Sequence, residues 1–223
     1  MSHWYDEWHS KMLDRSRQLS FLERKLVTPP AEKILDTLKP IFVAGQTLLD
    51  IGCGWGDALR KASALSLDPV GVDISNVALK ICKKHFEKER FPLLRSDSRH
   101  LPFRDDTFDF VICLGSLEHF PDMPLAIIEM SRVLKQTGLA LIFVPNSYFL
   151  GHIYLVWRTG VAPEEADQRG HETFLTRLQW QRLLEANHLC VCKVWKFNEI
   201  WASKKCHYRP KWSTTSFCDG LFL

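Results

Sequence analysis

The sequence predicts a doubly wound α/β fold, with a mainly parallel sheet between two layers of helices and a helical extension at the N-terminus. Short apolar runs suited to buried strands alternate with amphipathic segments through the middle of the chain. Two of these runs lead into an aspartate, Asp50 and Asp73. The first run is followed by three glycines at alternate positions, Gly52, Gly54 and Gly56, which indicates a tight loop between a strand and a helix. A chain of 223 residues suits one such domain.

The first 39 residues are expected to be helical. We predict helices at about residues 3–26 and 30–38, because Pro29 and Pro30 lie between them and proline can open a helix but not continue one. Aromatic side chains, including Trp4, Tyr5 and Trp8, give the first helix an apolar stripe. In the simplest interpretation this stripe packs on the helical layer of the sheet. Residues 1–39 then form an N-terminal cap.

Residues 45–146 carry the regular alternation and are expected to bind the ligand. Strands are predicted at residues 47–51, 69–72, 92–95, 108–113 and 139–144. Helices are predicted between them at residues 55–66, 75–89 and 123–134. Ser75 is expected to cap the second of these helices, and Thr137-Gly138 to stop the third.

The alternation breaks after this core. Residues 147–175 contain aromatic and acidic clusters and are interpreted as an insertion on the substrate side. A helix at 176–187 is expected to turn Leu178, Leu183 and Leu184 inward, and a sixth strand should follow at about 189–197. The remainder, to residue 223, forms either a final strand or an irregular tail.

Composition excludes several classes of protein. The hydrophobic content is 46%, the charged content 25% and the net charge +3, which is too small to indicate a nucleic-acid surface. No apolar run approaches the ~20 residues of a membrane span, and the N-terminus lacks the pattern of a secretion signal. We therefore expect a cytoplasmic protein without a transmembrane segment. Nothing in the sequence indicates its oligomeric state.

Cysteines do not suggest a metal or disulfide site. The seven cysteines are scattered, odd in number and without a C-x-x-C pair. Cys190 and Cys192, with Cys206 and His207 further on, would make at most an irregular ligand set. We expect reduced thiols and no metal.

The glycine loop carries a family resemblance. The segment LLDIGCGWGD at 48–57, with VGVDIS at 70–75, resembles the class I S-adenosylmethionine-dependent methyltransferases, whose first motif is an acidic residue followed by I-G-C-G-x-G. A dinucleotide site has the spacing G-x-G-x-x-G instead, which disfavours an NAD-dependent oxidoreductase. The resemblance covers 45–146 clearly and 170–194 weakly. It implies a Rossmann-like fold.

This resemblance implies a partner for each part of S-adenosylmethionine. Asp73 would bind both ribose hydroxyls, Ile74 would pack on the adenine, and Asp97 would meet the adenine amino group. The remaining expected cofactor-binding residues surround the methionine portion or flank Asp97: Asp50, Gly52, Cys53, Gly54, Gly56, Ser98, Leu114 and Gly115. The N-terminal helix could cover the site as a lid, as extensions in similar enzymes do.

Methyl transfer needs little from the protein besides in-line orientation and exclusion of water. A base is useful for a hydroxyl or phenol acceptor, and His119 is the first candidate because it follows the end of the fourth strand. Glu118 is the second and His171 the third. The alternative for His119 is a structural role in fixing the loop.

The acceptor is expected to be a small molecule. LPFRDDTFDFVICLGSLEHFPD, at 101–122, resembles the branch that includes quinone, sterol and natural-product methyltransferases. An N-P-P-Y-like motif for adenine or amide methylation and a Pro-Cys nucleophile for cytosine are absent. Two alternatives stay open: a protein or RNA methyltransferase, and a non-catalytic accessory protein that binds S-adenosylmethionine.

Overall fold

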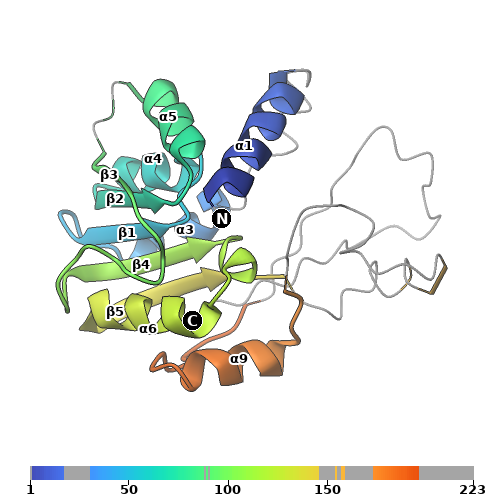
Figure 1. Cartoon of the computed structure of the whole chain (residues 1–223). Coiled ribbons are helices and arrows are strands. Elements are labelled where there is room, and N and C mark those ends of the chain that lie inside the picture. The colour runs from blue at the N-terminus through green and yellow to red at the C-terminus, as the bar shows by residue number, and fades with distance from the viewer. Residues whose placement is uncertain are drawn as a thin grey trace, which may run out of the picture.

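A five-stranded parallel sheet lies at the centre of the molecule (Figure 1), in the order β3-β2-β1-β4-β5. The computed structural model describes residues 2–17, 31–87, 89, 91–145, 154, 157, 158 and 173–195. The strands are β1 Thr47–Ile51, β2 Asp68–Asp73, β3 Leu93–Arg95, β4 Phe108–Leu114 and β5 Leu134–Phe143. The chain order reverses between β1 and β4, and ligands of open α/β sheets bind outside the carboxyl ends of strands at such a point. The predicted fold class is confirmed.

Helices cover both faces of this sheet. Their bounds are α1 Ser2–Arg17, α3 Ala31–Leu38, α4 Asp57–Ala64, α5 Asn76–His85, α6 Met123–Val133 and α9 Arg177–Glu185, with short 3-10 helices η1 Lys39–Ile41 and η2 Leu117–His119. The Ser75 hydroxyl accepts the Ala78 N–H at 3.1 Å, so the predicted cap of α5 is confirmed. Thr176 caps α9 in a capping box with Gln179.

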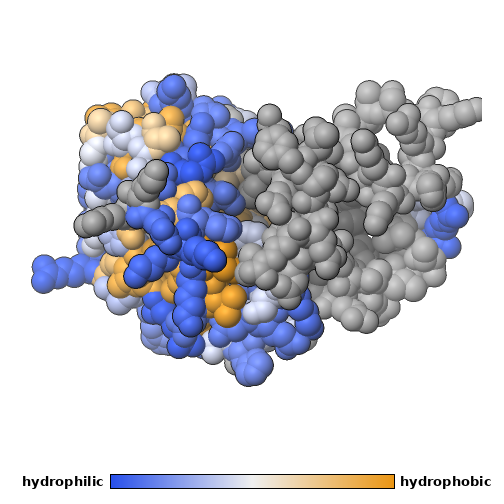
Figure 2. Space-filling view, turned by 90° about the horizontal axis from the view of Figure 1, so that it is seen from above, coloured by the Kyte–Doolittle hydropathy of each residue, from blue (hydrophilic) through white to orange (hydrophobic). Residues whose placement is uncertain are grey.

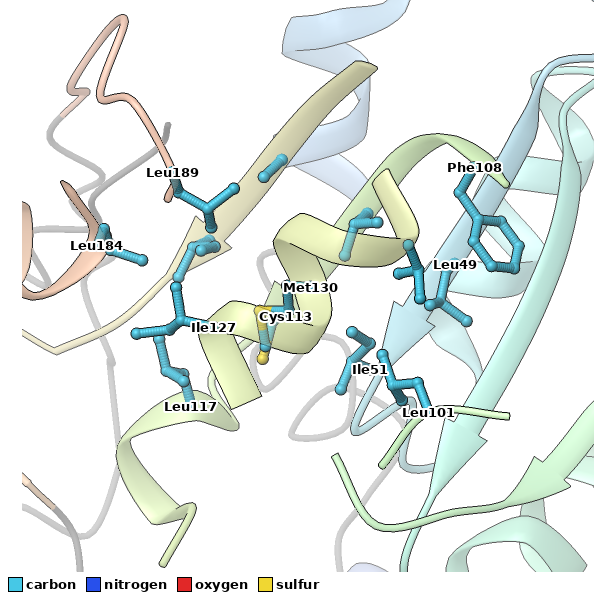
Figure 3. Packing of buried hydrophobic residues seen from close by; sticks show 14 of the residues in the cluster. Leu49, Ile51, Leu101, Phe108, Cys113, Leu117, Ile127, Met130, Leu184 and Leu189 are labelled. Atoms are coloured by element: carbon cyan, nitrogen blue, oxygen red, sulfur yellow. The ribbon is translucent and has the colours of Figure 1, made fainter. Parts of the chain in front are cut away.

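The core follows from the two-residue period of the strands. In β1, Leu49 and Ile51 belong to the cluster on the side of α6 and α9, whereas Leu48 packs with α3 and α4 on the other side. Figure 3 shows Ile127 and Met130 of α6 directed at Cys113 and Leu117. Burying a leucine stabilises the fold by about 1.5–3 kcal/mol, so both layers hold the sheet in position.

One predicted helix end is wrong. Strand β5 begins at Leu134, directly after α6, and Gly138 lies within that strand instead of stopping the helix. A Cβ on Gly138 would lie 2.9 Å from the carbonyl oxygen of Asp109, where the β4–β5 register shifts. The glycine is therefore needed for a close approach between strands, which gives the same local sequence signal as a helix stop.

The C-terminal prediction was wrong in part. Leu184 is buried and Leu183 packs against the core, but Leu178 is 49% exposed. Trp180 fills the core instead, and its indole N–H donates to the Pro145 carbonyl at 2.9 Å. Residues 189–195 do not form the predicted sixth strand, although Leu189 is buried in the core. The predicted tail lies outside the described residues.

Within the described ranges, none of the helices is long and apolar enough to cross a bilayer. Seen from above, hydrophilic side chains alternate with apolar patches over the described part of the molecule (Figure 2). Among the same residues, no group of three His, Cys, Asp or Glu side chains is arranged to hold a metal ion.

Candidate functional site

Asp73 joins the loops that follow β1 and β2. One carboxylate oxygen accepts the N–H of Gly54 at 2.9 Å, and the other accepts the N–H of Ser75 at 2.8 Å. Before it, the N–H groups of Gly52 and Cys53 donate to the Val72 carbonyl. The side chain is 7% exposed, so this carboxylate is held in a fixed position at the sheet edge.

The glycines of the loop are required by its shape. Gly52, Gly54 and Gly56 all have a positive φ, at 74°, 53° and 88°. A Cβ on Gly52 would lie 2.5 Å from Oγ of Ser116, which belongs to the loop after β4. At Gly54 a Cβ would meet nothing within 4 Å, so the loop presents bare backbone and open space there. A ligand can therefore approach this backbone closely.

Two buried carboxylates give the site an unusual electrostatic character. Asp50 in β1 is 3% exposed, and burial, followed by the nearby Asp73 and Asp57, raises its pKa to about 8. Burial also raises the pKa of Asp73, against the lowering effect of the N–H groups of Ser75 and Gly54. A cation bound beside these groups would favour their ionised forms, so the site suits a positively charged ligand.

Replacing Asp50 by Asn should make the protein more stable at pH 8. Because the folded-state pKa lies above the ordinary value of 3.8, the contribution of this group to stability is present below pH 3.8 and lost as the pH rises through about 8. We expect the free energy of unfolding of the variant to exceed wild type by about 2–5 kcal/mol at pH 8 and to approach it near pH 4. Denaturant titrations at both pH values measure this, and a difference that is equal at the two would contradict it.

Asp97, expected at the adenine amino group, already has a partner. Its carboxylate accepts hydrogen bonds from Nε and Nη2 of Arg99, at 3.0 and 2.7 Å, and from the Arg99 backbone N–H at 3.0 Å. The side-chain hydrogen bond of Arg99 holds the pKa of Asp97 below its ordinary value. Ile74 and Ser98 flank this region half-buried, and the Ile74 carbonyl accepts from Nε of Arg95. The charge of Asp97 is therefore already paired with a guanidinium, whereas the hydrogen bonds described for Asp73 come from backbone N–H groups.

The loop after β4 contains the first two catalytic candidates. Leu114 ends the strand, and the N–H of Gly115 donates to the Phe143 carbonyl at 2.8 Å. Glu118 is 5% exposed, and its backbone carbonyl accepts the Thr173 N–H at 2.9 Å. His119 is half-buried and ends η2. His171, the third candidate, lies outside the described residues.

The part of the chain that forms this edge of the sheet is similar to known proteins. Residues 49–142 match the model of a methyltransferase domain family. Demethylmenaquinone methyltransferase from Staphylococcus aureus is 35% identical over 135 residues, which are 58% of this chain and 54% of that protein. Residues 49–142 carry this match to a methyltransferase domain, and the rest of the chain lies outside it. The chain spans about half the length of this relative.

Solved structures show the same fold as this methyltransferase domain. The YcgJ protein of Bacillus subtilis aligns with a TM-score of 0.62 and 24% identity, over 74% of this chain and 72% of that one. Phosphoethanolamine N-methyltransferase 2 of Haemonchus contortus, in complex with S-adenosyl-L-methionine, aligns with a TM-score of 0.56 and 24% identity, over 70% and 36% of the two chains. At this identity the likeness extends to the fold alone.

Helix α1 reaches the site of the methyltransferase domain from a distant part of the chain. The Tyr5 hydroxyl donates to the His119 carbonyl at 2.6 Å, and the Asp6 carboxylate accepts from the Ser75 hydroxyl at 2.6 Å. Figure 1 shows α1 beside the carboxyl ends of the strands. Burial, followed by Asp73, Asp97 and Glu118, raises the pKa of Tyr5 to about 12. Helix α1 also packs against α5, so the expected packing on the helical layer is present, and the lid stays a prediction.

Sequence reasoning missed the polar residues of α1. One of them is Asp6, and another is His9, which contacts the glycine loop. The indole N–H of Trp55 donates to Nδ1 of His9 at 3.1 Å. Tyr5 was expected only as part of an apolar stripe. The available signal was spacing, because His9 follows Tyr5 by four residues and Asp6 by three, and each of these spacings brings two side chains together on a helix.

Proposed function

We propose that this protein transfers the methyl group of S-adenosylmethionine to a small-molecule acceptor. The observation that carries the proposal is the Asp73 carboxylate, fixed by the N–H groups of Gly54 and Ser75 beside a loop of left-handed glycines. This combination offers an acceptor for a ribose diol next to backbone that a ligand can approach. The methyltransferase domain at residues 49–142 supports this cofactor.

The chain offers groups that fit each part of the cofactor. Asp73 would accept both ribose hydroxyls, and Ile74 would cover one adenine face. The glycine loop, with Asp50 beneath it, would hold the methionine portion, whose ammonium suits a buried carboxylate. Leu114 and Gly115 would line the methionine portion on the side of β4. Asp97 and Ser98 would lie near the adenine, with Arg99 holding Asp97 in place.

The cofactor supplies a sulfonium-bound methyl group, which is already an activated electrophile. The tasks left to the protein are to orient the acceptor, exclude water and, for a hydroxyl or phenol, accept a proton. Helix α1 and the 115–120 loop would flank the methyl group, and the Tyr5 hydroxyl joins the two through the His119 carbonyl. His119 is the proposed base, with Glu118 beside it.

Several observations bear on the acceptor. The relative from Staphylococcus aureus is named for methylation of demethylmenaquinone, a small organic molecule, and this supports the same class here. The predicted cap at 1–39 and insertion at 147–175 would shape the acceptor pocket. A protein or RNA methyltransferase and a non-catalytic accessory protein are the alternatives. Release of S-adenosylhomocysteine with a panel of quinols, phenols and amines tests the proposal, and tight cofactor binding without any product would favour the accessory role.

Replacing His119 by Ala should lower the turnover number about 10²-fold or more for a hydroxyl acceptor, because a positioned base contributes roughly 10²–10⁴-fold. The affinity for S-adenosylhomocysteine should stay within about threefold of wild type, since the His119 backbone still accepts the Tyr5 hydroxyl. Steady-state kinetics and calorimetry separate the two effects, with the exposed His100 as a control substitution to Ala. Loss of cofactor affinity without loss of turnover would contradict the base assignment.

A further inference from the structure

His9 is a buried titratable side chain that methyl transfer itself does not require. It is 7% exposed, lies on α1, and packs edge-on against the ring of Trp8. Its Nδ1 accepts the indole N–H of Trp55 at 3.1 Å. Trp55 lies between Gly54 and Gly56, in the loop expected to meet the cofactor. A helix from the N-terminal cap is thus hydrogen-bonded to the cofactor loop through one imidazole.

This hydrogen bond requires one protonation state of His9. A ring nitrogen accepts a hydrogen bond only through its lone pair, and a doubly protonated imidazole has none. Since Trp55 can only donate, the bond exists when His9 is neutral with its proton on Nε2. Protonation would place two donors against each other and break the bond.

Burial and the nearby carboxylates have opposite effects on the pKa of His9. Burial lowers its pKa from the ordinary value of 6.5, whereas Asp73 and Asp6 act to raise it. Asp6 is engaged by the Ser75 hydroxyl and the Val77 N–H and is also near Arg95. The ring of His85 also lies T-shaped to the indole of Trp55, with 6.1 Å between the ring centroids. The effect of burial is larger than that of the two carboxylates, so the pKa of His9 is lowered and the folded protein favours neutral His9. The hydrogen bond between His9 and Trp55 is therefore weakened as the pH falls below 6.5.

We propose that His9 is a positioning residue for cofactor binding: from α1 it fixes Trp55 and the glycine loop in their binding arrangement, and its protonation releases this restraint. It touches neither the reacting atoms nor, by this account, the cofactor itself. The inference depends on cofactor binding but on no particular acceptor. Its test therefore uses binding alone, and it can fail while the proposed methyl transfer stands.

The test measures the dissociation constant of S-adenosylhomocysteine by calorimetry from pH 5.5 to 7.5. Wild type should lose about 3–10-fold in affinity at the acidic end from the loss of one hydrogen bond, in addition to any effect of other groups. His9→Ala should bind about 3–10-fold more weakly than wild type at pH 7.5 and lack this part of the pH dependence.

Two further variants make the outcome decisive. In His9→Asn the amide oxygen can accept from Trp55 near the position of Nδ1 without titrating, so affinity at pH 7.5 should be restored while the part of the acid-dependent loss that His9 causes disappears. Trp55→Phe should remove the same acid-dependent loss from the other side of the bond. If His9→Asn keeps the wild-type loss in acid, another group such as Asp73 or Asp50 causes it and the proposal is wrong. It is also wrong if His9→Ala binds like wild type at every pH.

Discussion

Replacing Asp73 by Ala will weaken the binding of S-adenosylhomocysteine by about 10²–10⁴-fold, because two charge-assisted hydrogen bonds of about 1.5–3 kcal/mol each are removed from the ribose. The same change leaves the N–H groups of Gly54 and Ser75 without their acceptor, so the loop loses order as well. Calorimetric titration of the purified variant measures the loss.

A second carboxylate at the same edge provides the matched control. Asp97 is held by Arg99, with 2.7 Å between Oδ2 and Nη2, so its charge is already paired with a cation of the protein. We expect Asp97→Ala to weaken binding by less than about tenfold, which corresponds to at most one hydrogen bond of ordinary strength. Equal losses for the two variants, or an Asp73→Ala protein that binds within threefold of wild type, would refute the assigned role of Asp73.

Replacing Gly52 by Ala should lower the free energy of unfolding by about 2–4 kcal/mol and abolish measurable cofactor binding. The new Cβ would lie 2.5 Å from Oγ and 2.7 Å from Cβ of Ser116, at a φ of +74°. Neither atom is the end of a long flexible side chain, so the loops after β1 and β4 must move apart. Denaturant unfolding and ligand titration measure the two consequences.

A variant at Gly54 is the control that tests backbone strain without a steric clash. Its φ is +53°, but an added Cβ meets nothing within 4 Å, so Gly54→Ala should cost only about 1–2 kcal/mol. Combining Gly52→Ala with Ser116→Gly removes both clashing atoms and should recover part of the lost stability. If Gly52→Ala and Gly54→Ala are equally destabilised, the packing of the two loops is not the reason for the glycine at position 52.

The sheet could be predicted from the sequence because its signals are local. Thr47–Ile51 forms the strand at the predicted bounds, and Ser75 caps α5 as expected, since alternation and capping depend on neighbouring residues. Leu178 and Trp180 show the limit of this reasoning. A helical period identifies an apolar face, but a short helix with leucines and a tryptophan around it permits more than one rotation against the core.

The sequence predicted only those site residues that lie at the ends of strands. Asp50, Asp73 and the glycines follow from the parallel topology, which brings the ends of consecutive strands to one edge. The contacts of α1 do not follow from any local pattern, because Asp6 meets Ser75 across 69 residues and His9 meets Trp55 across 46. Both residues would be ordinary polar positions on an isolated helix.

Binding of the cofactor is the most direct test of the whole account. The purified chain, titrated separately with S-adenosylhomocysteine and with NADH in a calorimeter, should bind the first saturably at one site and give no binding heat with the second. The Asp73→Ala variant should lose the response to S-adenosylhomocysteine. Saturable binding of NADH, together with no binding of S-adenosylhomocysteine by the folded wild-type protein, would contradict the account.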